Sequence, residues 1–198
     1  MGHIYNFQFT VVENSGIASQ FDESTISSKI MKALLNIQKD KIYKDVDENS
    51  INDGIRNQLS MIYDVKDQTR CGDSTSGIDS GEIDIMLCND GNPVVIIEGL
   101  RLDYINNDYL DEHINKALIN YDPVGCPLVY ILIYARVNRF DRFWYKVMSH
   151  MSNYRFPYEI AVPICEITTP YSESRHAKMV LNRNGRKINV HLYAVAMR

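Results

Sequence analysis

The chain has 198 residues, of which 45% are hydrophobic and 23% charged, and its formal net charge is −4. This length favours a single domain over residues 1–198, and the average composition excludes disordered, collagen-like and low-complexity proteins. The acidic balance argues against a nucleic-acid-binding surface that covers the whole molecule, but it is compatible with a local one.

The cysteines and the apolar runs indicate the cellular compartment in which the protein is expected. The four cysteines are widely spaced and form no C-x-x-C pair, which argues against a disulfide framework and a structural zinc site. The longest apolar runs, residues 94–97 and 129–133, are far too short to cross a bilayer, and no signal-peptide pattern opens the sequence. We therefore expect a cytoplasmic protein without a membrane partner.

The first part of the chain is predicted to contain a strand, two helices and a long polar loop. Residues 5–12 alternate weakly between apolar and polar side chains, as strands do. Apolar residues at helical spacing predict a helix over residues 23–39 and a second one from about residue 48. Candidate N-caps precede both helices: Asp22, Ser24 or Thr25 for the first, and Asp47 or Asn49 for the second. Residues 69–81, rich in Gly, Ser, Asp and Thr, predict the loop.

The rest of the chain is predicted to form a mixed sheet and two further helices. Asp90-Gly91 between two apolar runs is a strong signal for a β-hairpin. The predicted strands cover residues 82–88, 93–100, 128–135, 158–167, 177–181 and 187–197, and the predicted helices cover residues 109–119 and 140–151. This order predicts an α/β fold whose mixed central sheet has a hairpin at its centre and helices on its faces.

Two acidic residues lie in the strands of this hairpin, where burial is costly. Side-chain alternation puts Asp84 on one face with Met86, and Glu98 on one face with Leu100, so the two carboxylates can converge. Two like charges are unfavourable in a buried site unless a cation compensates, and a hard divalent cation such as Mg²⁺ prefers oxygen ligands. The pair therefore predicts the metal site of a phosphodiesterase, with loop capping or pairing to an arginine as the structural alternative.

The sequence Gly81-Glu82-Ile83-Asp84-Ile85, the hairpin and Ile96-Ile97-Glu98 together resemble the PD-(D/E)XK nuclease superfamily. The resemblance covers about residues 48–135 and is closest to the Mrr-like and Shedu-like branches of bacterial defence systems. It implies a restriction-endonuclease-like fold in which Asp84 and Glu98 bind Mg²⁺ or Mn²⁺ and nucleic acid is the substrate, with DNA favoured over RNA. It also implies an acidic ligand on the preceding helix. Glu48 is the candidate, although the helix dipole alone favours a glutamate there.

The chain departs from the family pattern at the motif lysine. Leu100 occupies that position, and the next cation, Arg101, lies on the opposite face of a regular strand. A bulge at Gly99 would bring Arg101 to the carboxylates, where it could hold a phosphate or stabilise the transition state but not act as a base. Other cations are candidates for the lysine's role: Lys66, Arg70 and Lys116.

Nucleic-acid contacts are expected from three further places. The polar loop with Arg70 and Ser74 offers a cation, hydroxyls and backbone amides for phosphate, unless it is an ordinary solvated loop. His113 and Lys116 lie one turn apart on the helix over residues 109–119, and His113 either contacts the substrate or packs in the core. A basic stretch near the C-terminus either follows a nucleic-acid backbone or contacts another subunit. It comprises Arg175, His176, Lys178, Arg183, Arg186, Lys187 and Arg198.

The expected function is metal-dependent hydrolysis of phosphodiester bonds by Asp84, Glu98 and Arg101, in a bacterial defence or restriction system. The sequence has no recognisable element that reads bases, so a partner protein or a homo-oligomer is expected to supply target choice. The missing lysine favours the alternative of a catalytically degenerate subunit that binds nucleic acid or a partner without cutting. A regulatory or protein-interaction domain is a third reading, which the acidic charge would suit.

Overall fold

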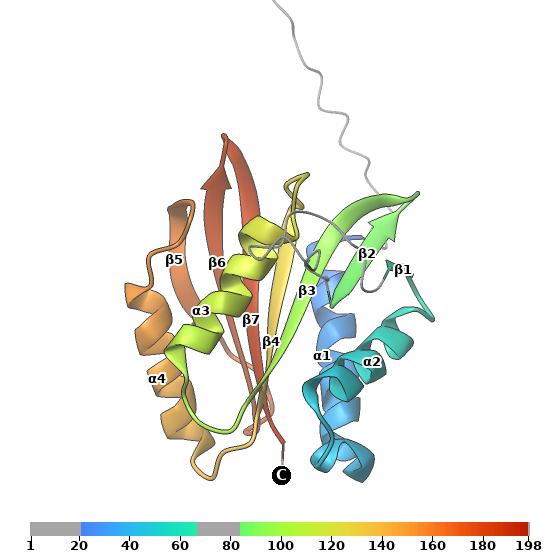
Figure 1. Cartoon of the computed structure of the whole chain (residues 1–198), viewed down its shortest axis with the longest axis vertical. Helices are drawn as coiled ribbons and strands as arrows, with labels where there is room; N and C mark the ends of the chain where they lie inside the picture. The colour runs from blue at the N-terminus through green and yellow to red at the C-terminus, as the bar shows by residue number, and fades with distance from the viewer. Residues whose placement is uncertain (1–20, 67–83, 198) are drawn as a thin grey trace, which may run out of the picture.

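The computed structural model describes residues 21–66 and 84–197 (Figure 1). The helices are α1 (Glu23–Lys39), the 3-10 helix η1 (Lys41–Lys44), α2 (Glu48–Leu59), α3 (Asn107–Asn115), the π-helical turn η2 (Lys116–Asn120) and α4 (Phe140–Asn153). The strands are β1 (Asp64–Lys66), β2 (Ile85–Asn89), β3 (Asn92–Leu102), β4 (Leu128–Ala135), β5 (Glu159–Ile167), β6 (Ser174–Arg183) and β7 (Arg186–Ala196). The predicted strand over residues 5–12 lies outside the described residues, as does the loop over residues 69–81.

The described strands form one seven-stranded mixed sheet in the order β1-β2-β3-β4-β7-β6-β5. β4 pairs in parallel with β3 on one side and with β7 on the other, whereas the outer pairs are antiparallel. Every residue of β4 is buried, as the uninterrupted apolar run predicts for a central strand. The α/β class with a mixed sheet is thus confirmed.

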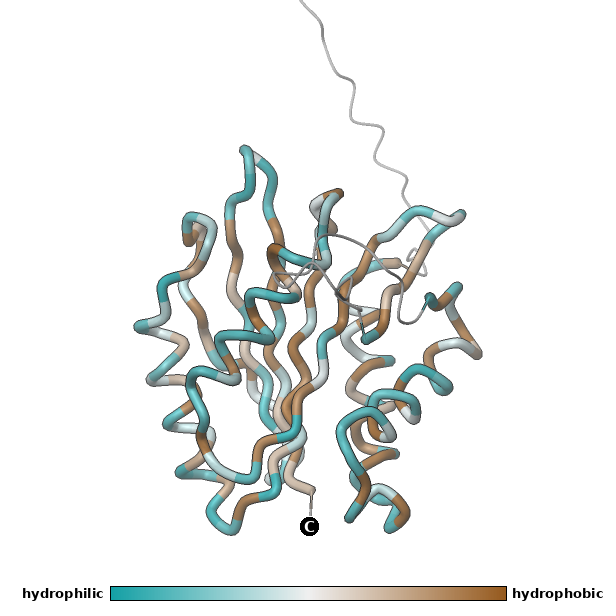
Figure 2. Tube along the Cα trace, in the orientation of Figure 1, coloured by the Kyte–Doolittle hydropathy of each residue, from teal (hydrophilic) through white to brown (hydrophobic). Residues whose placement is uncertain are grey.

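The helices cover both faces of the sheet, and alternation along β4 divides the core between them. Val129, Ile131 and Ile133 pack under α3 and α4, while Tyr130, Leu132 and Tyr134 pack under α1 and α2. Figure 2 shows hydrophobic residues gathered along the central strands and hydrophilic ones on the outer sides of the helices. Among the described residues, no helix has both the length and the apolar character that a membrane span requires.

Local sequence explains where these elements begin and turn. The side chain of Asp22 accepts hydrogen bonds from the N–H groups of Ser24 and Thr25 at the start of α1, and Asp47 caps α2 through Ser50 N–H. Asp90 and Gly91 have φ of 50° and 77°, the left-handed conformation that a tight β2–β3 hairpin requires.

Two features of the fold, one in the sheet and one in a helix, differ from the expectation. The sequence predicts a hairpin at the centre, whereas the structure places β4 there and the β2–β3 hairpin beside it. The sequence also predicts one continuous helix over residues 109–119, but the helix changes to π-helical geometry at Lys116. The short strand β1 and the 3-10 helix η1 are too brief to leave a periodic signal.

Candidate active site

The candidate site lies where β3 extends past the hairpin. β2 pairs with β3 as far as Ile85 opposite Ile97, and β3 then continues beside β4 to Leu102. Two backbone N–H groups on this stretch donate to carboxylates: Gly99 N to Asp84 Oδ2 at 2.9 Å and Arg101 N to Glu48 Oε2 at 2.7 Å. Acidic side chains from α2 and from the start of β2 therefore take the place of a neighbouring strand.

Asp84 and Glu98 lie side by side on one face of the sheet, as the sequence predicts. Since Ile85 pairs with Ile97 in antiparallel register, Asp84 comes next to Glu98. Their alternate neighbours Met86 and Ile96 belong to the core under α3 and α4, so both carboxylates face α3. Glu98 is only 2% exposed. The convergence of these two residues is confirmed.

Helix α3 provides the partner of Glu98. His113 is buried and its Nδ1 lies 2.8 Å from Glu98 Oε1, within hydrogen-bond distance. Tyr109 packs edge-on against the His113 ring at 4.4 Å between centroids and donates its hydroxyl to Glu48 Oε2 at 3.0 Å. Glu98 Oε2 and His113 Nε2 are buried and have no hydrogen-bond partner among the described residues. Buried polar atoms of this kind ordinarily have a partner, so these two atoms are available to a bound ligand.

The surroundings of Asp84 and Glu98 disfavour the ionised form of both carboxyl groups. Burial raises the pKa of Asp84 to about 7, and the charge of Glu98 adds to this rise while the Gly99 N–H opposes it. Burial likewise holds the pKa of Glu98 well above its usual range, although the positive charge of Lys116 acts in the other direction. Burial also lowers the pKa of His113, which keeps the imidazole neutral. A cation bound between the two carboxylates would relieve these costs.

The position of the motif lysine is filled by an apolar side chain. Leu100 is buried in the core under α3 and α4. The β3–β4 register runs without a shift from Val95 to Leu102, so the bulge considered at Gly99 is not formed. Arg101 accordingly points to the face opposite Glu98, where its guanidinium binds the carboxylate of Asp103 and the carbonyl of Val46. The structure does not bring this guanidinium to the carboxylate pair.

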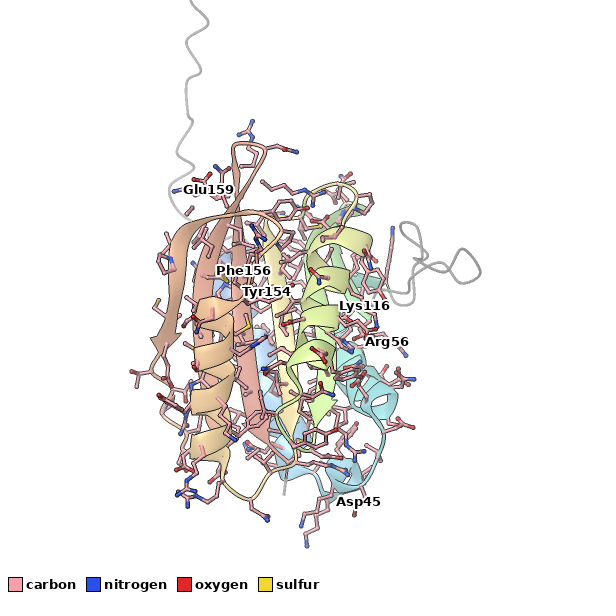
Figure 3. All side chains as sticks on the ribbon, turned by 60° about the vertical axis from the view of Figure 1, so that its left-hand side comes forward. Asp45, Arg56, Lys116, Tyr154, Phe156 and Glu159 are labelled. Atoms are coloured by element: carbon pink, nitrogen blue, oxygen red, sulfur yellow. The ribbon has the colours of Figure 1, made fainter. Side chains whose placement is uncertain are left out.

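Lys116 is the cation whose charge reaches Glu98. It lies where α3 passes into η2, and its Nζ is 2.8 Å from Glu112 Oε1. Its charge opposes the rise of the Glu98 pKa. In the view of Figure 3, Lys116 and Arg56 of α2 extend on the same side of the molecule. A π-helical turn is often found at functional sites, and here it begins at this lysine.

A second cluster fixes the backbone at Gly99. Asn52 of α2 accepts a hydrogen bond from the hydroxyl of Tyr134 of β4 at 2.7 Å, and both side chains are buried. A Cβ atom at position 99 would overlap Asn52 Oδ1 and lie 2.7 Å from the Tyr134 hydroxyl oxygen. Only glycine therefore fits between Glu98 and Leu100. The sequence gives no signal for Tyr109 or Tyr134, because their contacts join segments far apart in the chain.

The donor set fits a hard divalent cation in part. Asp84 and Glu98 present carboxylate oxygens, one of them the unpartnered Glu98 Oε2, and such oxygens are the preferred ligands of Mg²⁺. Glu48, the expected third ligand, is held by Arg101 N and the Tyr109 hydroxyl. Within residues 21–66 and 84–197, no three His, Cys, Asp or Glu side chains gather into a metal-binding group. Backbone oxygens or water would have to complete the coordination.

The remaining candidates for nucleic-acid contacts are dispersed. Arg70 and Ser74 lie outside the described residues. In the basic C-terminal stretch, three cations are engaged within the chain: Lys178 with Glu23, Arg183 with Asp122, and Arg175 with Glu166 at 3.8 Å. These pairs stabilise the contacts of β6 and leave less free positive charge than the sequence suggests.

Comparison with known proteins gives no relative: no protein-family model, no curated protein and no solved structure matches the chain. The case for a function therefore depends on the residues of the site itself.

Proposed function

We propose that the chain is a metal-dependent nuclease of the PD-(D/E)XK type, in which Asp84 and Glu98 hold Mg²⁺ or Mn²⁺. The observation that carries the proposal is the unpartnered buried oxygen of Glu98 beside Asp84, a carboxyl group whose pKa is raised to about 7. A pair that only stabilised the fold would gain nothing from a buried oxygen without a partner. When bound, the cation would activate water and offset the charge of the phosphate.

The other residues are assigned roles that need no lysine in the motif. The hydrogen bond from His113 Nδ1 to Glu98 Oε1 orients that carboxylate. Lys116 brings the positive charge that the motif lysine would bring, from a helix instead of the strand. Glu48 and Tyr109 fix the edge of β3 through Arg101 N–H, so that Glu98 and Gly99 keep their positions. Arg101 has no catalytic role in this proposal.

The test is cleavage of plasmid, linear duplex and single-stranded DNA and RNA with Mg²⁺ or Mn²⁺. We expect cutting by the wild type to be lost in Asp84→Asn and Glu98→Gln, because each removes a charged ligand while keeping the shape of the side chain. Lys116→Ala should reduce the rate about a hundredfold, the usual scale for a single electrostatic group, and Lys116→Arg should restore part of it. Glu159→Gln, a change at an exposed carboxylate on β5, is the control and should cut normally.

One observation favours a second candidate, a nuclease fold that binds without cutting. Leu100 replaces the motif lysine within the core, and Glu98 Oε1 is already bonded to His113. In that case no substrate would be cut with either metal, and binding of nucleic acid would not depend on divalent cations. Cutting that survives both Asp84→Asn and Glu98→Gln would instead mean that the site lies elsewhere in the chain.

A further inference from the structure

A groove runs between the start of α3 and the outer side of α4. It consists of two hollows of about 600 Å³ and 450 Å³, which share Tyr104, Ile105 and Lys146. The first continues along α4 to Asn153, and the second reaches the β4–α4 connection at Arg136. Figure 1 shows α3 and α4 on the same face of the sheet, so the groove lies on the face to which Glu98 points. We refer to these two hollows as the α3–α4 groove.

One side of this groove is cationic. Arg139, Arg142 and Lys146 follow one another at helical spacing on the start of α4, and Arg136 precedes them. Arg139 is paired with Asp141, and Arg136 lies 3.9 Å from Asp45. Arg142 and Lys146 are exposed and have no acidic partner among the described residues. Their charges are available to an anionic ligand.

Two acidic groups near the groove, Asp103 and Asp111, are occupied. Asp103, at its rim, is held by the guanidinium of Arg101, and Asp111 lies 2.6 Å from His150 on the inner side of α4. The local balance is therefore positive at Arg142 and Lys146, although the whole chain has a net charge of −4. A local cationic surface on an acidic protein is the arrangement expected for steering one kind of anion to one place.

Two exposed tyrosines flank the same hollows. Tyr104 is 68% exposed and Tyr145 is 76% exposed, unusual values for such large rings. Both line the hollow, as do Asn107 and two asparagines whose amides are bonded within the chain, Asn106 to Tyr109 N and Asn153 to Ser149 O. Aromatic faces beside cations bind bases that are free of a base-paired stack, and amides can bond base edges. A duplex hides its base faces, so this combination suits a single strand.

We propose that the α3–α4 groove binds a single-stranded segment of nucleic acid, with phosphates at Arg142 and Lys146 and bases stacked on Tyr104 and Tyr145. The inference rests on the proposed nuclease function, since it supplies a path for the strand beside the carboxylates. Helix α3 connects the two places: Asn107 lines the groove, and Tyr109, two residues later, reaches Glu48 in the candidate active site. DNA and RNA single strands share the chemistry that the groove recognises.

The experiment measures fluorescence anisotropy of short labelled single strands of DNA and RNA and of a duplex, in EDTA, over a series of salt concentrations. We expect single strands to bind more tightly than the duplex. Arg142→Ala with Lys146→Ala should weaken binding about tenfold and lower the salt slope for a single strand by about 1.4, because two phosphate contacts are lost. Tyr104→Ala with Tyr145→Ala should weaken binding about tenfold with the salt slope unchanged. The corresponding change of both tyrosines to Phe should keep the affinity.

The control is Lys32→Ala with Lys39→Ala, which removes the same charge from exposed positions on α1. Equal weakening by this control, tighter binding of the duplex, or affinity unchanged in both groove variants would overturn the proposal. Displacement of the labelled strand by polyglutamate at equal charge would show an unspecific anion site and would also overturn it. Because binding is measured in EDTA, where metal-dependent cutting cannot occur, the experiment tests the groove even if the protein proves not to be a nuclease. Conversely, cutting with unchanged binding in the groove variants would refute the groove alone.

Discussion

The buried carboxyl groups of Asp84 and Glu98 destabilise the folded protein when they are ionised. Burial raises the pKa of both carboxyl groups. The charge of Glu98 adds to the rise at Asp84, whereas the charges of Glu48 and Glu112 add to the rise at Glu98. A group whose pKa is higher in the folded than in the unfolded state destabilises the fold once it ionises, because the unfolded chain gives up the proton more easily. The free energy of unfolding therefore falls as the pH rises from about 4 to about 7, and the full cost of the ionised Asp84 remains above pH 7. Such a cost is common at functional sites and is offset when the ligand binds.

A neutral side chain at position 84 should then stabilise the metal-free protein. Asp84→Asn removes the charge while its amide oxygen can still accept from Gly99 N–H, so we expect the free energy of unfolding at pH 8 in EDTA to rise by about 1 kcal/mol. In a thermal melt, this corresponds to a rise in Tm of about 2–4 °C for a chain of this size. Added Mg²⁺ should raise the Tm of the wild type but not of the variant.

Glu48→Gln is the matched control for this measurement. The charge of Glu48 adds to the raised pKa of Asp84 and of Glu98, but Glu48 also accepts hydrogen bonds from Arg101 N and the Tyr109 hydroxyl, which a neutral amide accepts less strongly. Its replacement should leave the Tm unchanged or lower it. A lower Tm for Asp84→Asn at pH 8 would show that the Asp84 carboxylate stabilises the fold, and it would remove the main support for a cation site.

At the scale of single elements, the sequence predicts well what depends on local patterns. The bounds of α1 and β4 are confirmed residue for residue, since helical spacing with an aspartate cap and an uninterrupted apolar run define them. The Asp90-Gly91 turn is confirmed for the same reason. Alternation along the hairpin strands also suffices to bring Asp84 next to Glu98.

What the sequence does not predict depends on contacts between distant elements. The order of strands is decided by which strands pair, so the position of the hairpin beside β4 could not be read from the hairpin itself. The Asn52–Tyr134 hydrogen bond joins α2 to β4 across 82 positions, and nothing near either residue indicates it. The change from α- to π-helical geometry at Lys116 likewise has no local sequence signature.

Gly99 shows how tightly α2 and the sheet are fitted together. A methyl group at this position would meet Asn52 and the Tyr134 hydroxyl, so we expect Gly99→Ala to lower the free energy of unfolding by about 2 kcal/mol through overpacking. Denaturant unfolding of the variant would measure the loss. In an Asn52→Ala background the space is free, and the same substitution should cost much less. An equal loss in both backgrounds would mean that a cause other than the Asn52 contact is responsible.

At the scale of the whole molecule, the candidate site lies where the two helical layers come together. The sheet separates α1 and α2 from α3 and α4, and each pair covers its own core. The hydroxyl of Tyr109 of α3 nevertheless donates directly to Glu48 of α2 at the stretch of β3 that lies beyond the start of β2. The backbone N–H groups of Gly99 and Arg101 at this edge bind carboxylates that come from both sides, which gives the site a rigid frame. This arrangement suits a site that must hold a cation and admit a polymer.

On the face of the sheet that α1 covers, two buried histidines lie side by side. His176 Nε2 of β6 lies 2.9 Å from His191 Nδ1 of β7, and His191 Nε2 lies 3.1 Å from Glu23 Oε1 of α1. The rings of His176 and Tyr193 are stacked with their centroids 4.1 Å apart. Burial lowers the pKa of each histidine to about 4, with the charge of His191 adding to the effect on His176. Both are therefore neutral in the folded protein at physiological pH.

Acid should consequently destabilise the protein through this pair. The unfolded histidines take up a proton near their ordinary pKa of 6.5, whereas the folded ones resist it down to about 4. Stability is therefore complete above pH 6.5 and is lost as the pH falls, by about 1 kcal/mol per histidine between pH 6.5 and 5.

Denaturant unfolding at both pH values would compare the wild type with His176→Gln, whose amide keeps a donor near the Nε2 position but does not titrate. Asp84, whose ionisation has the opposite pH dependence, is present in both proteins and cancels in the comparison. The drop in stability should be smaller in the variant, and an equal drop would show that the histidine pair does not set the acid sensitivity.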